Sequence, residues 1–267
     1  MKHLPNILTL CNLLCGCAAI AFALESHPYW AVNASEYEIV FGTEQLYWAS
    51  VFIGIAGVFD LLDGAVARAL KVFSPIGKDL DSLADVISFG VAPSMILYKM
   101  LWAAYMREPN ALSVSMWSML PAFLVACFAA LRLARFNINA TQQKWSFTGM
   151  PVPAVGIIVA SFPLVDLFYG QNAVTNKLAS ALQSKWTIYG IIALLCWLMV
   201  SKLPFFKLMP AKRQIKYMWP QIILVLAAAA AIPLLHVAAI PVLFGLYIIL
   251  SLVYRAPEEA TTQTAKI

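Results

Sequence analysis

The sequence predicts an all-α integral membrane protein, a bundle of about eight transmembrane helices. Two observations predict this class. Of the 267 residues, 62% are hydrophobic and only 12% are charged, and the apolar residues come in long blocks. Soluble domains carry about 25% charged residues, roughly twice that share. The mean hydropathy of +0.79 agrees with a chain that resides in a bilayer.

The apolar blocks are compared with the length that a membrane helix needs, about 20 residues. Eight segments are candidates, at about residues 6–24, 46–70, 82–105, 117–136, 151–169, 186–201, 220–235 and 237–254. The last two are separated only around His236, so they form either a tight hairpin or an incomplete pair, and seven spans are the alternative. The first segment carries Asn6, Thr9 and Asn12, which a simple secretory signal has little reason to contain.

Positive residues lie mostly on one side of the predicted membrane. With a cytoplasmic N-terminus, fourteen of the 18 lysines and arginines fall inside and three outside, while Lys99 lies within a helix. The first outer loop, residues 25–45, has four glutamates and no lysine or arginine. Because positive residues concentrate in cytoplasmic loops, we expect both termini in the cytoplasm and multi-pass insertion in the cell (inner) membrane. The net charge of +5 then reflects the membrane borders, and no nucleic-acid partner is expected.

Two aspartates fall within the second apolar segment, where ionisable residues are costly and usually functional. Asp60 and Asp63 share one helical face with Gly64, Ala67 and Arg68, because their spacings follow the helical period. The small residues leave room for a ligand beside the backbone. The guanidinium offers a planar fork that suits a phosphate.

Three more aspartates open the third segment. Asp81 and Asp85 are four residues apart and share a face, whereas Asp79 points elsewhere. Two carboxylates facing two others would repel strongly without a cation. Carboxylate oxygens suit hard cations, and Mg²⁺ typically combines them with substrate phosphates. We therefore expect Mg²⁺ or Mn²⁺. The cysteines lie in apolar stretches and the histidines are scattered, which argues against zinc.

The loop between the two segments adds a basic rim, Lys71 and Lys78, around Ser74 and Gly77. Two alternative interpretations of these charged residues involve no catalysis and compete with a metal–phosphate site. A membrane ion-pair network would need more cations than these lysines and the one facing arginine. A cation or proton pathway would more often distribute its acids along several helices.

These residues also carry a family resemblance. The chain resembles the CDP-alcohol phosphotransferase family at eight positions of fixed spacing, Asp60-x2-Asp63-Gly64-x2-Ala67-Arg68-x8-Gly77-x3-Asp81-x3-Asp85. Further runs are similar to one branch, the membrane-integral phosphatidylserine synthases, at residues 4–12, 81–93, 135–137, 147–153 and 201–207. The likeness covers roughly residues 4–207. It implies a family-like transmembrane core at 1–201, followed by a basic cytoplasmic loop at 202–219, additional helices at 220–254 and a polar tail at 255–267.

The resemblance implies transfer of the phosphatidyl group of CDP-diacylglycerol to the hydroxyl of L-serine, with release of CMP. It also implies a homodimer with a six-helix core, two divalent ions and a site that faces the cytosol. Asp60, Asp63 and Asp81 would bind metal, and Asp85 would bind the second metal and act as the general base. Gly64, Arg68 and Ser74 would contact the CDP portion, and Asn6 and Thr9 would lie near the cytidine.

The acceptor is predicted less directly. Arg132 and Arg135 end the fourth segment near the same surface, and one of them is expected to hold the serine carboxylate or a lipid phosphate. Arg135 is preferred because it belongs to the branch-like Arg-Phe-Asn run. The alternative is that both arginines are anchors that extend to the headgroups.

Three rival functions remain at this point. A sister enzyme using glycerol phosphate or inositol phosphate would share every aspartate, although a phosphorylated acceptor should need a denser basic pocket. An intramembrane prenyltransferase also binds diphosphate through aspartates, but four positions argue against it: Gly64, Ala67, Arg68 and Gly77. A transporter is the rival of a different class, and the two related halves often found in transporters are not evident here.

Overall fold

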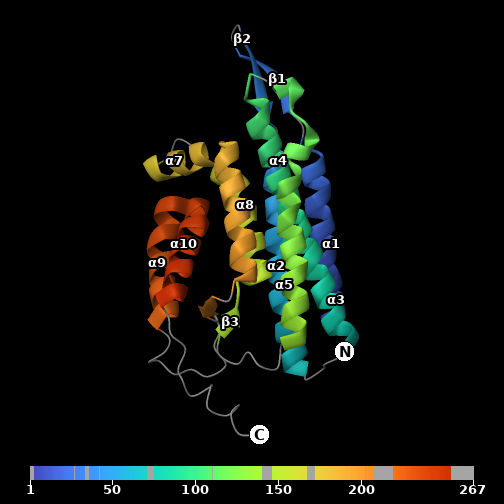
Figure 1. Ribbon diagram of the computed structural model, residues 1–267. Coiled ribbons are helices and arrows are strands. Elements are labelled where there is room, and N and C mark those ends of the chain that lie inside the picture. Colours follow the sequence, from blue (N-terminus) through green and yellow to red (C-terminus); the bar gives the residue numbers. More distant parts are fainter. Residues whose placement is uncertain are drawn as a thin grey trace.

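The computed structural model describes residues 3–26, 28–33, 36–41, 43–70, 75–109, 111–139, 146–166, 172–201, 203–206 and 219–253. Within these ranges the chain is a bundle of long helices with short elements at its two ends (Figure 1). Helix α1 (Leu4–Leu24) packs along α2 (Thr43–Leu70). At 1.5 Å per residue α1 is about 31 Å long, which matches a hydrocarbon core of about 30 Å.

The third span is one continuous helical stretch that contains a π-helical segment between two α-helices. Helix α3 (Pro75–Asp85) passes into a π-helical segment, η1 (Val86–Val91), and then into α4 (Ala92–Met106). The apolar stretch Ile76–Met106 has 31 residues, so it begins about six residues before the predicted start at 82. The sequence pattern did not predict the π-helical turn, because its residues are as apolar as those of an ordinary membrane helix.

The next helices are less regular. Three 3-10 turns, η2 (Ala111–Ser113), η3 (Met116–Ser118) and η4 (Leu120–Phe123), precede α5 (Leu124–Asn139). Helix α6 (Val152–Asp166) has 15 residues, fewer than the roughly 20 that span a bilayer. Helices α7 (Ala173–Leu182) and α8 (Lys185–Val200) meet at a bend of 86°.

The last two helices form the hairpin that the sequence allowed. Helix α9 (Trp219–Leu235) and α10 (Ala239–Val253) lie side by side (Figure 1). Between them η6 (His236–Ala238) turns the chain, and His236 has a positive φ of 50°. The Asn172 side chain donates to the Leu234 carbonyl at 2.8 Å and joins this turn to the start of α7. The beginning of α1 and the end of α10 consequently lie at the same end of the bundle (Figure 1).

The all-α membrane class is confirmed. By length and composition, five helical stretches of the described chain are able to cross a membrane, or six if the bent α7–α8 pair is one span. Each of the eight predicted segments coincides with a helix, although α6 is short for a full crossing. Eight spans therefore stay a prediction, as do the four sequence regions and their boundaries.

Two connections contain short antiparallel strand pairs that the pattern of apolar blocks did not predict. Strand β1 (Pro28–Asn33) pairs with β2 (Glu36–Phe41) in the connection between α1 and α2, with Pro28 opposite Phe41. Strand β3 (Ser146–Thr148) pairs with β4 (Pro204–Phe206). Because β3 precedes α6 and β4 follows α8, the second pair joins connections that are far apart in the sequence.

Small residues allow the helices to approach closely. Ala19 and Ala23 of α1 and Ala49 and Ala56 of α2 are essentially inaccessible, as expected where membrane helices pack backbone to backbone. Large apolar side chains such as Leu14, 69% exposed, project outward where lipid tails would cover them.

Lys99, the charged residue predicted inside a membrane helix, lies on α4. Its ammonium donates to the carbonyls of Leu24 and Ser26 at 3.0 and 2.9 Å. Leu24 is the last residue of α1 and Ser26 lies two residues beyond it, at the helix end where carbonyls are left without intrahelical donors. The charge of Lys99 thus caps the C-terminal end of α1.

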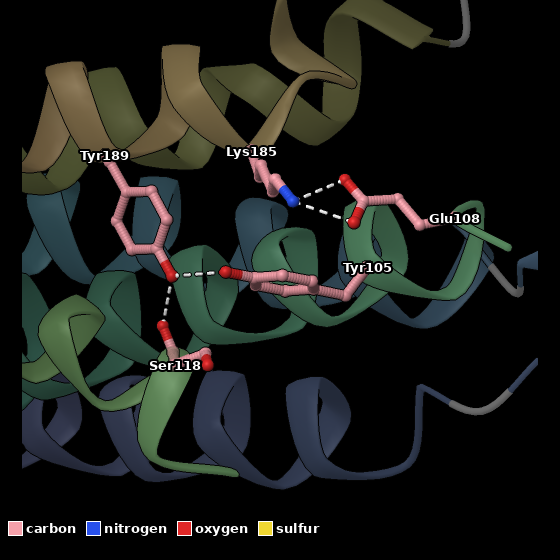
Figure 2. Close-up of polar contacts among 5 residues, drawn as sticks. All are labelled: Tyr105, Glu108, Ser118, Lys185 and Tyr189. Carbon is pink, nitrogen blue, oxygen red and sulfur yellow. Dashed lines mark hydrogen bonds and ion pairs between the residues drawn. The ribbon is translucent and has the colours of Figure 1, made fainter. Parts of the chain in front are cut away.

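A polar cluster ties α8 to α4 at the end of the bundle opposite the N-terminus (Figure 2). Lys185 Nζ lies 2.7 Å from the Glu108 carboxylate, and the hydroxyls of Tyr105 and Tyr189 are 2.9 Å apart. Tyr189 also donates to the Ser118 carbonyl of η3. These contacts join the end of α4 to the start of α8 at this end of the bundle.

Candidate active site

Three aspartates converge from two helices. One carboxylate oxygen from each of Asp60, Asp63 and Asp81 lies within 4.8 Å of the other two. Asp60 and Asp63 project from α2, and Asp81 projects from α3, as the helical spacing predicted. Asp63 is 7% exposed and the other two are half-buried. At 1.5 Å per residue, Asp60 and Asp63 lie only about 15 and 10 Å from the end of α2, so the cluster sits near one end of the bundle.

Asp85 lies beside this cluster and outside its tightest part. Its carboxyl group, 7% exposed, interacts electrostatically with Asp60, Asp81 and Asp63. Among the described residues, its Oδ1 atom and the Oδ1 atom of Asp81 are buried without a hydrogen-bond partner. Buried carboxylate oxygens rarely remain unpartnered, because their desolvation is costly. Asp79, by contrast, is exposed and does not belong to the group.

The donor set fits a hard divalent cation. All the atoms that converge are carboxylate oxygens, and two buried oxygens still lack a partner among the described residues. Carboxylates near a phosphate-bearing substrate are the ligands that Mg²⁺ commonly uses. Asp60, Asp63 and Asp81 would hold such an ion.

Helix α1 supplies a contact to this cluster. Thr9 is buried, and its Oγ1 lies 2.7 Å from Asp63 Oδ2 and 3.0 Å from the Pro5 carbonyl. The hydroxyl that was expected near a cytidine thus donates a hydrogen bond to a carboxylate. Asn6, nearly one turn earlier, is half-buried. The sequence held a signal for this contact, because Thr9 is a polar residue within an apolar helix.

The residues expected at the phosphates lie at the end of the same helices. A Cβ on Gly64 would come within 3.3 Å of Arg68 Nη1, so the glycine lets the guanidinium fold back over α2. Arg68 is exposed and interacts electrostatically with Asp63. Lys78 is exposed and donates to the Asn137 carbonyl at 3.3 Å. Ser74 and Lys71 lie outside the described residues.

The two arginines of α5 differ in their burial and in their neighbours. Arg135 is exposed, whereas Arg132 is buried and interacts electrostatically with Asp85 and with Tyr247 of α10. Its guanidinium also lies 5.2 Å from the centre of the Phe136 ring.

The position of Arg132 follows from helical periodicity. The buried residues Ala122, Val125 and Ala129 mark the inward face at steps of three and four, and Arg132 continues that series. This regular spacing is visible in the sequence, which offered both arginines as candidates and gave the preference to Arg135 because of the Arg-Phe-Asn motif.

The π-helical segment directly after Asp85 is held from three sides. Phe89 is fully buried, and a Cβ on Gly156 of α6 would meet it at 2.8 Å. A Cβ on Gly90 would lie 3.3 Å from the Ala129 Cβ of α5. Ser88 donates to the Asn12 carbonyl of α1 at 3.0 Å. A π turn often marks a functional position. Here it begins directly after Asp85, so its packing helps to fix the position of that residue.

Comparisons with known proteins agree with this geometry. The profile of the family described as CDP-alcohol phosphatidyltransferase matches residues 2–255. A CDP-diacylglycerol–serine O-phosphatidyltransferase of Helicobacter pylori is 32% identical over 93% of this chain and 89% of its own length. A Bacillus subtilis enzyme of the same name is 32% identical over 61% of this chain and 77% of its own length. An archaetidylserine synthase of Methanothermobacter thermautotrophicus is 32% identical over 62% of this chain and 59% of its own length.

The family profile spans nearly all of the chain, and the H. pylori relative exceeds 30% identity over most of both sequences. Three of the four aspartates that carry the family resemblance, Asp60, Asp63 and Asp81, are the ones that α2 and α3 bring together. The chain is therefore a multi-pass membrane enzyme that belongs to the CDP-alcohol phosphatidyltransferase family.

Proposed function

We propose that the chain transfers the phosphatidyl group of CDP-diacylglycerol to the hydroxyl of L-serine, giving phosphatidylserine and CMP. The observation that carries this proposal is the convergence of Asp60, Asp63 and Asp81, with Asp85 beside them, at one end of a membrane bundle. Relatives named CDP-diacylglycerol–serine O-phosphatidyltransferase support serine as the acceptor.

Divalent metal is part of the proposal. Asp60, Asp63 and Asp81 would hold Mg²⁺ or Mn²⁺, and Asp85 would contribute to a second ion. Such ions would supply positive charge that neutralises the diphosphate and stabilises the leaving phosphate.

The basic residues at the end of α2 and the start of α3 are proposed to bind the CDP phosphates. Gly64 and Arg68 would act together, because the glycine keeps the guanidinium close to the acids. Lys78 and Ser74 are proposed for the same part of the substrate.

The chemical step is a substitution at phosphorus. The serine hydroxyl oxygen attacks the phosphorus atom that carries the diacylglycerol, and the bond from that phosphorus to the CMP oxygen breaks. Asp85 accepts the hydroxyl proton, a role that needs the carboxylate within hydrogen-bond reach of the acceptor. CMP leaves with the electron pair of the broken bond.

Arg132 is proposed to bind the serine carboxylate. Its guanidinium is buried on α5 and faces Asp85, so an amino acid held there would present its hydroxyl toward the base. A guanidinium pairs with a carboxylate through two parallel hydrogen bonds. Exposed Arg135 is better suited to the lipid headgroups, the role that the sequence left open for both arginines.

The proposed location is the inner membrane, with the site open to the cytoplasm. The distribution of lysine and arginine supports this orientation. So does the position of the first and last described helix ends on one side of the bundle. At such a border the acyl chains stay in the bilayer while CDP and serine remain in water. A homodimer is also proposed, on the basis of the family resemblance.

An acceptor comparison tests the proposal. The purified protein is supplied with CDP-diacylglycerol and Mg²⁺ or Mn²⁺, and CMP release is measured with serine, glycerol phosphate and inositol phosphate in parallel. Release that depends on serine is expected. Release with inositol phosphate alone would make the chain a sister enzyme of the family. Substrate flux across vesicles without product would instead indicate a transporter.

A further inference from the structure

Asn12 of α1 is a fully buried amide whose side chain has no conventional partner. Its relative exposure is 0%, and within the described part of the chain neither Nδ2 nor Oδ1 makes a hydrogen bond of ordinary geometry. A buried amide without partners is destabilising compared with an apolar side chain of the same size. A role in packing alone therefore does not account for an asparagine at this position.

The backbone around Asn12 is tightly fixed. Its carbonyl accepts a hydrogen bond from Ser88 of the π-helical segment at 3.0 Å. One turn later, a Cβ on Gly16 would lie only 2.8 Å from the Ser88 Cα, so no larger residue fits between α1 and this segment. These two contacts hold α1 against the turn that directly follows Asp85, and they involve no side-chain atom of Asn12.

The Asn12 amide approaches the carboxyl group of Asp85, whose Oδ1 is buried and unpartnered among the described residues. Three residues earlier, Thr9 makes the corresponding contact with Asp63 at 2.7 Å. Positions three apart lie on one helical face. One face of α1, which carries no acid, thus meets one aspartate of α2 and one of α3.

We propose that Asn12 is a positioning residue that fixes the Asp85 carboxylate for the transfer reaction. In this role Nδ2 would donate to Asp85 Oδ1 when substrate is bound, and the other carboxylate oxygen would be left to face the acceptor hydroxyl. The inference rests on the proposed role of Asp85 as the base. A carboxylate that is free to rotate would spend less time in reach of the proton, and misplacement by about 1 Å is able to cost about 10²-fold in rate.

The test combines Asn12→Ala with Asp85→Asn in a double-mutant cycle on the purified full-length protein. Asn12→Ala is expected to lower kcat about 10- to 100-fold, with KM for CDP-diacylglycerol changed less than about 3-fold. If Asn12 acts through Asp85, adding it to Asp85→Asn lowers kcat by less than about 3-fold more. Equal, multiplicative effects in both backgrounds would overturn the proposal.

Two further measurements separate positioning from ligation and from packing. Electron paramagnetic resonance of Mn²⁺, titrated without substrate, is expected to give an affinity for Asn12→Ala within about 3-fold of the parent, because Asp60, Asp63 and Asp81 remain. A loss of about tenfold or more would mean that Asn12 supports the metal site and not the base, and would overturn the proposal. Asn172→Ala is the matched control, since it removes an amide contact at the opposite end of the bundle and should leave kcat unchanged.

A second variant covers the case in which Asn12→Ala does not fold. Asn12→Gln keeps the amide and moves it by one methylene, so the proposal expects reduced kcat with Mn²⁺ binding retained. Full activity of Asn12→Gln would overturn it. Full activity of Asp85→Asn would instead refute the assignment of Asp85 as the base. This outcome is distinguished from failure of the Asn12 proposal because the Asp85→Asn single variant is measured in the same cycle.

Discussion

The Thr9 hydroxyl of α1 lies 2.7 Å from the Asp63 carboxylate of α2. This contact joins the first helix to the face of α2 that carries the converging aspartates, across 54 residues of sequence. A hydrogen bond to a charged acceptor is among the stronger ones in proteins, at about 1.5–3 kcal/mol. It therefore restricts which way the Asp63 oxygens point.

Removing this hydroxyl gives the first prediction. Thr9→Val keeps the shape of the side chain and deletes the donor, so the Asp63 carboxylate loses its fixed orientation. We expect kcat/KM to fall by about 10- to 100-fold, the usual effect of losing a residue that supports a metal ligand. Thr9→Ser restores the donor and should recover most of the activity. Ser50→Ala, which removes a buried hydroxyl bonded to the Leu46 carbonyl, is the control.

The second prediction concerns which aspartates are needed for activity and for metal binding. Asp60→Asn, Asp63→Asn and Asp81→Asn each remove a charged ligand from the converging set. Each should abolish CMP release and weaken Mn²⁺ binding, measured by calorimetry. Asp79→Asn should retain most activity, because Asp79 is exposed and outside the set. An inactive Asp79→Asn beside an active Asp63→Asn would mean that the wrong face of the helix has been assigned to the site.

The two arginines of α5 allow a controlled test of which residue binds the acceptor serine. Arg132→Lys keeps a positive charge but loses the planar fork, so we expect a rise in KM for serine of at least about tenfold. KM for CDP-diacylglycerol should change much less. Arg135→Lys should leave both values nearly unchanged because that side chain is exposed. The opposite ranking in steady-state kinetics would restore Arg135 as the acceptor ligand.

Topology is tested independently of activity. In a cysteine-free background, a cysteine at Glu36 of β2 should react with an impermeant maleimide added from the outside of intact cells. A cysteine at Lys212, predicted in the basic cytoplasmic loop, should react only after the membrane is opened. Both follow from the segregation of positive residues. Labelling of position 36 only from the cytoplasmic side would invert the proposed orientation.

Much of the site could be predicted because helical periodicity is a local property. Asp60 and Asp63, like Asp81 and Asp85, have spacings that determine a shared face once the segments are helical. The partners of those acids depend on which helices pack together, and that is a long-range property. The family resemblance implied that Thr9 lies near the cytidine, and the helical pattern gave no sign of its contact with Asp63.

Other features escaped prediction for related reasons. The π-helical turn at Val86–Val91 packs against α1, α5 and α6, and nothing in its own composition distinguishes it. The preference for Arg135 followed a motif, whereas burial favours Arg132 because it continues the inward face of α5. The roles of both arginines depend on packing that a single sequence does not display.

The most direct measurement of the central claim follows both products of one reaction. Purified protein in mixed micelles receives CDP-diacylglycerol, radiolabelled serine and Mg²⁺ or Mn²⁺, and CMP and labelled lipid are quantified together. We predict equal amounts of CMP and phosphatidylserine, neither of them formed by Asp60→Asn or in the presence of a metal chelator. CMP release without labelled lipid, or labelled lipid formed by Asp60→Asn, would contradict the account.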